Sequence, residues 1–424
     1  MNVIEWKKST WKELEKKIQS RDFSPKKIEA ARKIIRDVRR KGDRALRKFT
    51  LEFDGAEIKS LRVPEREIRS ARKVITPEVK KSFRRVEGNI RRYCLSNLIK
   101  SWRQGRGDGL SWGEKVTPIE RVGIYVPGGK APLVSSLFMA AVPARLAGVA
   151  RIAICTPPQT DGTINPYILA AADFLGIGEI YRIGGAQAIA ALAFGTETVP
   201  RVDKIVGPGN IYVTLAKKEV YGIVGIDMLA GPSEVVILAD GKARPAFIAA
   251  DLLAQAEHGG GGMSILITSS GRLISGVKKE ADSLLSDLSR KSILGKSLKE
   301  GTWLIKVKSI KNGIDLVNRI APEHLEIMAG NPDRILPAIK NAGAIFLGEY
   351  SPVAAGDYVA GPSHILPTGR SARFFSPLSA IDFSKRSSVI RYNRRALRRD
   401  MDALKNLAEL EGLDAHALSV SIRL

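Results

Sequence analysis

The sequence predicts an α/β protein with two doubly wound, Rossmann-like α/β domains and small helical extensions at both ends. Three observations lead to this prediction. Short apolar strands recur from Arg121 onward, they alternate with helical segments, and several of them end in glycine turns. Uninterrupted apolar strands that alternate with helices are typical of parallel sheets covered on both faces.

The first quarter of the chain reads as helical. Up to about Gly109, apolar residues repeat with a helical period, with one strand-like stretch at 58–63. Pro25 and Pro64 stand where helices can begin. A length of 424 residues suggests two or three domains.

From Arg121 the elements alternate in a regular order. The predicted strands are RVGIYVPGG, ARIAICTPP, EIYRIGG, VDKIVGPGN, SEVVILAD, MSILITSS, TWLIKV and GAIFLG. The helices between them include PLVSSLFMAAVPARLAGV, where Pro143 predicts a kink, and residues 244–258. The last forty or so residues are basic and read as a helical appendage.

The charge balance is strongly basic. Sixty-eight Lys and Arg residues against 44 Asp and Glu give a net charge of +24. Much of this charge lies in the first hundred residues and in the run Arg386–Arg399, both of which we interpret as solvated helix faces. No RNP, zinc-finger or KH pattern is present, so we expect no specific nucleic-acid partner.

The remaining bulk features predict a cytoplasmic protein. No apolar run reaches the length of a membrane span, and the N-terminus does not resemble a signal peptide. The two cysteines, Cys94 and Cys155, are far apart, which argues against a disulfide framework and a thiolate metal site.

Glycines follow three of the predicted strands. They are Gly128–Gly129, Gly184–Gly185 and the stretch from Gly207 to Asn210. Ligands of such sheets bind outside the carboxyl ends of the strands, where glycine lets a phosphate approach the backbone. No complete G-x-G-x-x-G is present, so both a nucleotide-like ligand and plain turns remain open.

Each of the four histidines has polar company. The groupings are Gln255 with His258, Glu323 with His324, Asp357 with His364, and Glu411 with His416. Imidazole and carboxylate together are common in catalytic metal sites, but each histidine alone is more often structural. Four glycines follow His258, which indicates either a helix end or a close approach to a ligand.

Eight stretches, taken together, resemble the histidinol dehydrogenase family. They are VGIYVPGG, GGAQAIAALAFGTETVP, VDKIVGPGN, AGPSEVVILAD, AQAEH, APEHLE, AGDYVAGPSHILPTG and EGLDAHALSVSIR. They occur in the family's order over nearly the full chain. Eight motifs in order are far more specific than any one of them.

The resemblance implies a set of site residues. One zinc ion per subunit would be ligated by Gln255, His258, Asp357 and His416. Substrate would be contacted by these ligands and by Ser233, His324, His364 and Glu411. NAD would be contacted by Tyr125, Gln187 and Asn210. Glu323 and His324 would be the catalytic acid–base pair.

The same resemblance implies the reaction and the assembly. L-histidinol would be oxidised to L-histidine through the aldehyde, with two NAD reduced, in the last step of histidine biosynthesis. His324 would take the alcohol proton and Glu323 would activate water. The active site would be shared across a homodimer, with the partner supplying the C-terminal segment.

We expect a division into four parts. Residues 1–25 form an N-terminal helical extension, and 26–124 with 235–377 form a first α/β domain carrying most metal and catalytic residues. Residues 125–234 form the NAD-binding domain, and 378–424 form an extension that reaches the partner.

The sequence departs from the family pattern at two places, and three other functions are alternatives to the one that the resemblance implies. The GGGGM run at 259–263 and Arg370, where glycine is expected, are the departures. The alternatives are a relative that oxidises another amino alcohol or diol, an aldehyde dehydrogenase using Cys155 or Cys94, and a nucleic-acid-binding protein.

Overall fold

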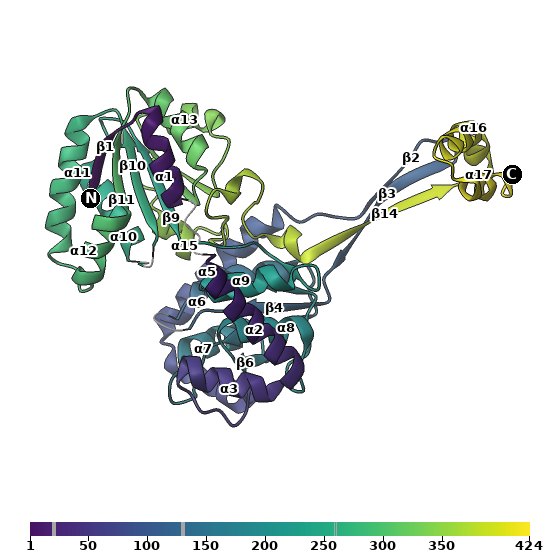
Figure 1. Cartoon of the computed structure of the whole chain (residues 1–424), viewed down its shortest axis with the longest axis horizontal. Helices are drawn as coiled ribbons and strands as arrows, with labels where there is room; N and C mark the ends of the chain where they lie inside the picture. Colours follow the sequence, from purple (N-terminus) through teal and green to yellow (C-terminus); the bar gives the residue numbers. More distant parts are fainter. Residues whose placement is uncertain (19–22, 129–131, 258, 260) are drawn as a thin grey trace.

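The chain folds into two α/β bodies and one long arm (Figure 1). A computed structural model describes residues 1–424 except 19–22, 129–131, 258 and 260. Each body contains a parallel sheet with helices on both faces. The predicted α/β class with two such units is confirmed.

The first body is built on a five-stranded parallel sheet. Its strand order is β6-β5-β4-β7-β8. The strands are β4 (Arg121–Tyr125), β5 (Arg151–Thr156), β6 (Ile180–Arg182), β7 (Lys204–Val206) and β8 (Gly225–Ile226). The connecting helices are α6 (Val134–Leu146), α7 (Pro166–Phe174), α8 (Gly185–Phe194) and α9 (Ile211–Val220). Pro143 lies inside α6, and the kink there stays a prediction.

The N-terminal helices pack on this same sheet. They are α2 (Pro25–Lys41), α3 (Asp43–Asp54), α4 (Glu65–Ser70) and α5 (Pro77–Leu95). Leu46 of α3 shares a core with Ala153 of β5, and Phe83 of α5 shares one with Ile124 of β4. This differs from the predicted grouping of residues 26–124 with 235–377, because these helices bury their apolar faces against the other sheet.

The second body is built on a six-stranded parallel sheet. Its order is β1-β11-β10-β9-β12-β13. The strands are β1 (Asn2–Glu5), β9 (Glu234–Ala239), β10 (Met263–Thr268), β11 (Thr302–Lys306), β12 (His324–Met328) and β13 (Ala344–Leu347). The helices are α1 (Trp11–Ile18), α10 (Pro245–Ala256), α11 (Gly271–Leu285), α12 (Lys291–Gly301), α13 (Ile310–Ile320), α14 (Pro332–Ile335) and α15 (Val353–Tyr358).

The N-terminal segment is part of this second body. β1 pairs with β11 as an edge strand, so residues 1–25 are not the purely helical extension that was predicted. Helix α1 is anchored to the loop around Arg370, which stacks on Trp11 and pairs with Glu15. Arg370 adopts a left-handed backbone (φ 69°), which explains why glycine is expected at this position.

The arm stands away from both bodies (Figure 1). It is a three-stranded antiparallel sheet of β2 (Trp102–Gly105), β3 (Leu110–Pro118) and β14 (Ser384–Tyr392), with β3 in the middle. At its tip lie α16 (Arg394–Leu410) and α17 (Asp414–Ser421). The basic run 386–399 is therefore half strand and half helix, and the prediction that all of it is helical is wrong.

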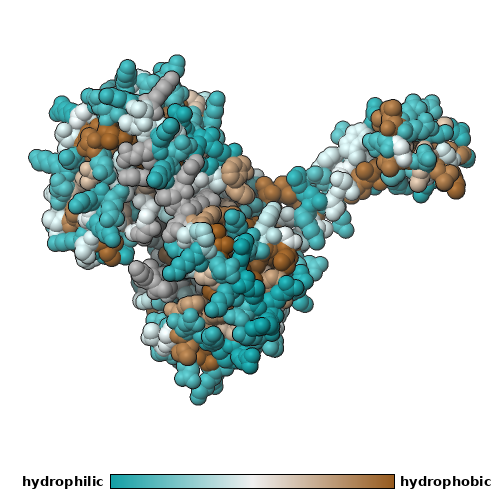
Figure 2. Space-filling model, viewed as in Figure 1, coloured by the Kyte–Doolittle hydropathy of each residue, from teal (hydrophilic) through white to brown (hydrophobic). Residues whose placement is uncertain are grey.

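The tip carries apolar side chains on its surface (Figure 2). Leu410 is 84% exposed and Ile422 is 77% exposed.

Short 3-10 turns at Lys8–Thr10, Ala71–Val74, Leu336–Ala338, Ser371–Arg373 and Ala380–Phe383 complete the structure. Within the described residues, no helix is both long and apolar enough to cross a lipid bilayer.

Gly207 fixes the turn at the end of β7. Its φ is 114°, and a Cβ there would lie only 2.1 Å from the carbonyl oxygen of Tyr125 on the neighbouring strand. Gly222 has a similar positive φ of 98°, but a Cβ there would meet nothing within 4 Å. Both glycines therefore have a backbone conformation that favours glycine, but only Gly207 lacks room for a side chain.

Gly207→Ala should destabilise the protein more than Gly222→Ala. The left-handed backbone alone costs an alanine about 1–2 kcal/mol, and forcing an atom into the occupied space at 207 adds about 1–3 kcal/mol. Urea unfolding of both variants measures the difference in the free energy of unfolding. Equal losses would contradict a steric demand at Gly207.

Candidate active site

A cavity of about 170 Å³ lies where the two bodies meet. From the first body it is lined by Ser136 at the start of α6 and by Gly209 after β7, so it opens on the carboxyl edge of the five-stranded sheet. From the second body it is lined by Ser233, Glu323 and His324, which stand at the amino edge of the six-stranded sheet.

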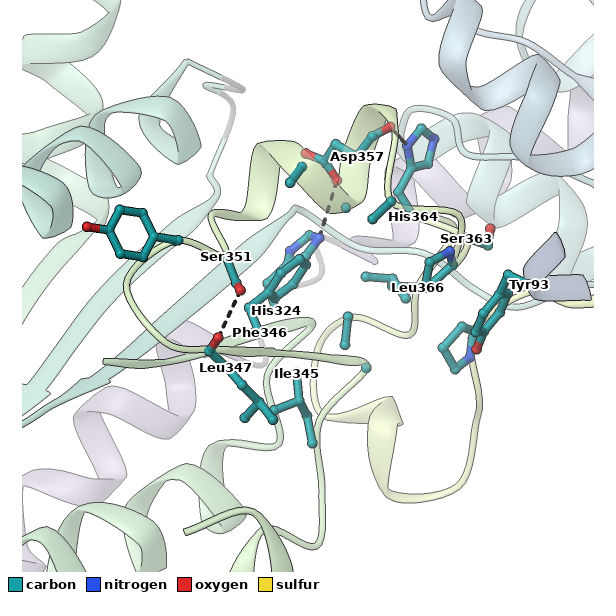
Figure 3. Close-up of a pocket in the computed structure, with 18 residues that line it drawn as sticks. Tyr93, His324, Ile345, Phe346, Leu347, Ser351, Asp357, Ser363, His364 and Leu366 are labelled. Atoms are coloured by element: carbon teal, nitrogen blue, oxygen red, sulfur yellow. Dashed lines mark hydrogen bonds and ion pairs between the residues drawn. The ribbon is translucent and has the colours of Figure 1, made fainter. Parts of the chain in front are cut away.

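A larger pocket of about 640 Å³ lies beside this cavity and shares part of its lining (Figure 3). The shared residues are His324, Asp357, His364 and Leu366. Figure 3 shows His324 and Asp357 pointing toward one another, with His364 beside Asp357. Five of the predicted site residues therefore line this one cavity: Ser233, Glu323, His324, Asp357 and His364.

His324 is held at the start of β12 by a backbone contact. β12 pairs with β9 in parallel, with His324 opposite Val235. The ring atom Nδ1 lies 3.0 Å from the carbonyl oxygen of Glu234. Because a carbonyl can only accept, Nδ1 donates, and Nε2 is the ring nitrogen that can gain or lose a proton.

Glu323 is fixed by two donors on the same oxygen. Its Oε2 accepts from the Ser233 hydroxyl (2.7 Å) and from the backbone N–H of Glu234 (2.8 Å). Burial raises the pKa of Glu323, and the neighbouring His324 together with these two hydrogen bonds opposes that rise. A carboxyl held in this way can exchange a proton with a group in the cavity.

Asp357 and His364 form the opposite wall. Asp357 Oδ1 lies 3.6 Å from Nε2 of His324, an ion-pair distance. His364 Nδ1 donates to the backbone carbonyl of Asp357 (2.8 Å), and its Nε2 lies 3.0 Å from the Ser136 hydroxyl. Ser136 thus couples this wall to the first body.

The charge state of His324 follows from its neighbours. Burial opposes the charged ring, but Glu323 and Asp357 outweigh it and raise the pKa of His324 to about 9. The ring is only 4% exposed. In the metal-free protein His324 is therefore protonated at neutral pH.

Gln255 stands in the last turn of α10, at the same amino edge. It is buried, and its Nε2 makes no hydrogen bond to any described residue. His258, the predicted ligand three residues later, lies outside the described residues. In the run that follows, Gly259 and Gly261 have positive φ, and a Cβ on Gly262 would lie 2.9 Å from the carbonyl oxygen of Ser233.

Glu411 and His416 are not near the other predicted site residues. Both are exposed at the tip of the arm, Glu411 at the end of α16 and His416 in α17. Figure 1 shows this tip far from both bodies of the same chain. Among the described residues no group of three or more His, Cys, Asp or Glu side chains could hold a metal ion.

The three predicted NAD contacts share the carboxyl edge of the five-stranded sheet. Tyr125 ends β4, Gln187 lies in the first turn of α8 and Asn210 caps α9 after β7. The Tyr125 hydroxyl accepts from the N–H of Gly185 (3.1 Å). Both polar atoms of the buried Gln187 amide lack a partner within the described structure.

This edge is also where the strand order changes direction. From β4 the chain moves to β5 and β6 on one side and later to β7 and β8 on the other. In open α/β sheets, ligands bind at such a point. Asp54, which sequence reasoning missed, lies beside Tyr125 here, and burial raises its pKa to about 6.

Other site residues were also missed by sequence reasoning. Ser136 contacts His364, the Glu234 carbonyl holds His324, and Thr368 accepts from the N–H of Gly231. A backbone carbonyl carries no sequence signal. Ser136 could have been found only from its place just after a glycine turn.

Comparison with known proteins gives one consistent result. The profile of the family described as Histidinol dehydrogenase matches residues 18–424. A histidinol dehydrogenase of Listeria monocytogenes serotype 4b (strain F2365) is 49% identical over 390 residues, covering 92% of this chain and 91% of its own length. One of Moorella thermoacetica is 49% identical over 394 residues, with coverages of 92% and 93%.

A solved structure agrees with these sequence comparisons. The crystal structure of histidinol dehydrogenase from Elizabethkingia anophelis superposes with a TM-score of 0.95 at 37% sequence identity. The superposition covers 100% of this chain and 98% of the other. The likeness therefore extends over both bodies and the arm.

The raised pKa of His324 predicts a pH dependence of the stability of chelator-treated protein. An unfolded histidine titrates near 6.5, so the stabilisation is complete below that pH and is lost as the pH rises through about 9. The stability difference between wild type and His324→Asn should shrink between pH 6 and 9.5. Urea unfolding at several pH values measures it; a difference that grows would contradict the assigned neighbours.

Proposed function

The chain belongs to the histidinol dehydrogenase family, and from that membership we propose that it oxidises L-histidinol to L-histidine with two NAD as hydride acceptors. The observation that carries the proposal is the shared cavity. It joins the carboxyl edge of one sheet, where a dinucleotide fits, to the edge of the other sheet that presents Glu323 and His324.

The residues present fit a dinucleotide at the first edge. The glycine at 207 lets the backbone of β7 approach that of β4, and Gly185 brings its N–H to the Tyr125 hydroxyl. The buried Gln187 amide has donor and acceptor atoms without partners in the described structure. Tyr125, Gln187 and Asn210 are the contacts that we assign to NAD.

The donor set at the second edge fits a zinc ion. Asp357 would supply a carboxylate oxygen, and His258 and His416 would supply imidazole nitrogens; both kinds of atom are ordinary zinc ligands. Gln255 would supply an amide oxygen, which is a less common one. Bound zinc would orient the imidazole and amine of the substrate. With Ser233, His364 and Glu411, these ligands would form the substrate site.

The chemistry of the first oxidation falls to His324. Its Nε2 faces the cavity wall formed by Asp357, while Nδ1 is committed to the Glu234 carbonyl. The neutral ring takes the proton of the alcohol while hydride passes to NAD, which leaves the aldehyde, NADH and one proton. A cation held by Asp357 would offset one of the two carboxylates that keep this ring charged, and so favour the neutral form.

The second oxidation requires water, and here Glu323 acts. Its carboxylate takes a proton from water as the oxygen adds to the aldehyde. His324 returns the proton that it took from the alcohol to the former carbonyl oxygen, which gives the hydrate and a neutral ring. His324 then takes a proton from the hydrate while a second hydride passes to NAD, leaving the acid. Ser233 and the N–H of Glu234 hold Glu323 in place for this step.

The site is completed only by a second copy of the chain. Glu411 and His416 lie on the exposed tip, away from the body of their own chain. We therefore propose a homodimer in which each tip reaches the cavity of the partner. The two buried, unpaired cysteines accord with the cytoplasm, which is the compartment we propose.

Two NADH should form per L-histidinol consumed, and only after zinc is restored to chelator-stripped protein. The stoichiometry follows from the alcohol-to-acid oxidation, and absorbance at 340 nm measures it. One NADH would mean that the reaction ends at the aldehyde and that Glu323 has another role. No turnover by folded, zinc-loaded protein, but turnover of another amino alcohol or diol, would replace the substrate.

Two inactive variants should restore activity to each other if the site is shared. His324→Asn disables the body of its chain, because His324 acts in both oxidations, and His416→Ala disables the tip. In each mixed dimer, one of the two sites combines an intact body with an intact tip. Mixed dimers make up about half of a co-expressed population, so about a quarter of wild-type activity should return. Each variant expressed alone is the control. No recovery in verified mixed dimers would place His416 outside the partner's site.

A further inference from the structure

Two buried carboxyl groups, those of Asp251 and Glu326, lie on the same elements as the proposed site residues Gln255 and His324. Glu326 follows His324 by two positions on β12, so both side chains project from the same face of the strand. Asp251 precedes Gln255 by four positions on α10, so these two share one face of the helix. The carboxyls of Asp251 and Glu326 face each other between helix and strand.

Glu326 contacts a third element as well. Its Oε1 accepts from the backbone N–H of Val353 at 2.9 Å. Val353 is the first residue of α15, the short helix that carries Asp357. This N–H is one that a helix start cannot satisfy internally. One fully buried side chain therefore joins β12 to α15 and, through Asp251, to α10.

The contact between the carboxyls requires a proton. No N–H or O–H of the described residues donates to Oε2 of Glu326, and two carboxylates side by side would repel. Burial raises the pKa of Glu326 to about 8, and burial also raises that of Asp251 to about 6. Near neutral pH the pair therefore shares one proton and forms a hydrogen bond.

We propose that Asp251 and Glu326 are a positioning pair that fixes α10 and α15 against β12, and thereby sets the spacing of Gln255, His324 and Asp357. Apolar side chains would fill the same space at less cost in buried charge. A hydrogen bond between Asp251 and Glu326 also fixes the position of α10 along β12, which apolar packing alone does not. The inference rests on the proposed function, since it is there that Gln255 and Asp357 are assigned to zinc.

The test compares three substitutions in the full-length protein. Asp251→Ala removes the hydrogen bond, Asp251→Asn keeps a donor to Glu326, and Asp282→Ala removes an exposed helical carboxylate as a control. Zinc affinity is measured by competition with a chelator, and kcat and KM are measured for L-histidinol. Melting temperatures show that each protein is folded under assay conditions.

Asp251→Ala should lose roughly 10- to 100-fold in zinc affinity, the usual cost of losing support behind metal ligands, with a lower kcat. Asp251→Asn should recover zinc affinity to within a few-fold of wild type. If Asp251→Ala does not fold, Asp251→Leu fills its volume without the hydrogen bond and should show the same loss. Zinc affinity and kcat within twofold of wild type in folded Asp251→Ala or Asp251→Leu would overturn the proposal.

The two proposals fail in different ways. If wild type binds zinc but does not oxidise L-histidinol, the proposed function fails, while the zinc affinities of the three variants still decide the role of the pair. If wild type turns over normally and Asp251→Ala matches it, only the positioning role fails.

Discussion

The parallel pairing of β9 with β12 is the constraint on which the rest of the site depends. It sets His324 opposite Val235, and so brings the residues just before the two strands side by side. From that register follow the Ser233 and Glu234 donors on Glu323 and the Glu234 carbonyl on His324. Because a slip by one residue would turn every side chain to the other face of the sheet, the register is fixed by the buried cores on both faces.

The two sheets contribute opposite edges to the same cavity. The five-stranded sheet offers its carboxyl edge, which is the ordinary place for a ligand in a parallel sheet. The six-stranded sheet offers its amino edge, where β12 begins with His324 and α10 carries Gln255 in its last turn. Since α10 runs antiparallel to the strands, its last turn lies at that edge. Polar groups from different parts of the sequence therefore converge.

Much of this architecture could be predicted from the sequence. Apolar runs identified β4, β5, β6 and β7, and glycine turns follow three of them, β4, β6 and β7. The rule for parallel sheets indicated their carboxyl edge as a binding site. β12 was not predicted, because HLEIM contains two ionisable residues inside a buried strand. The placement of α2–α5 could not be predicted either, since an amphipathic helix matches the apolar face of any sheet.

The remaining errors have physical reasons of the same kind. β14 is exposed along nearly its whole length, so no alternation of buried and exposed residues marks it as a strand. Resemblance to a family supplied the residues that we propose for zinc, substrate and NAD, but gave none of the contacts that hold them. Ser136, the Glu234 carbonyl and the carboxyl pair of Asp251 and Glu326 became visible only in three dimensions.

The two paired strands of the arm, β3 and β14, are made at very different times during translation. β3 emerges early from the ribosome, but its partner β14 is made some 272 residues later, as the pair Glu114 and Arg386 shows. At about 5–20 residues per second, that delay is roughly a quarter of a minute to one minute. During this time β3 has an open edge, a hazard for aggregation. Both α/β bodies have been made before β14, so the sheet of the arm is the last of the three sheets to be completed.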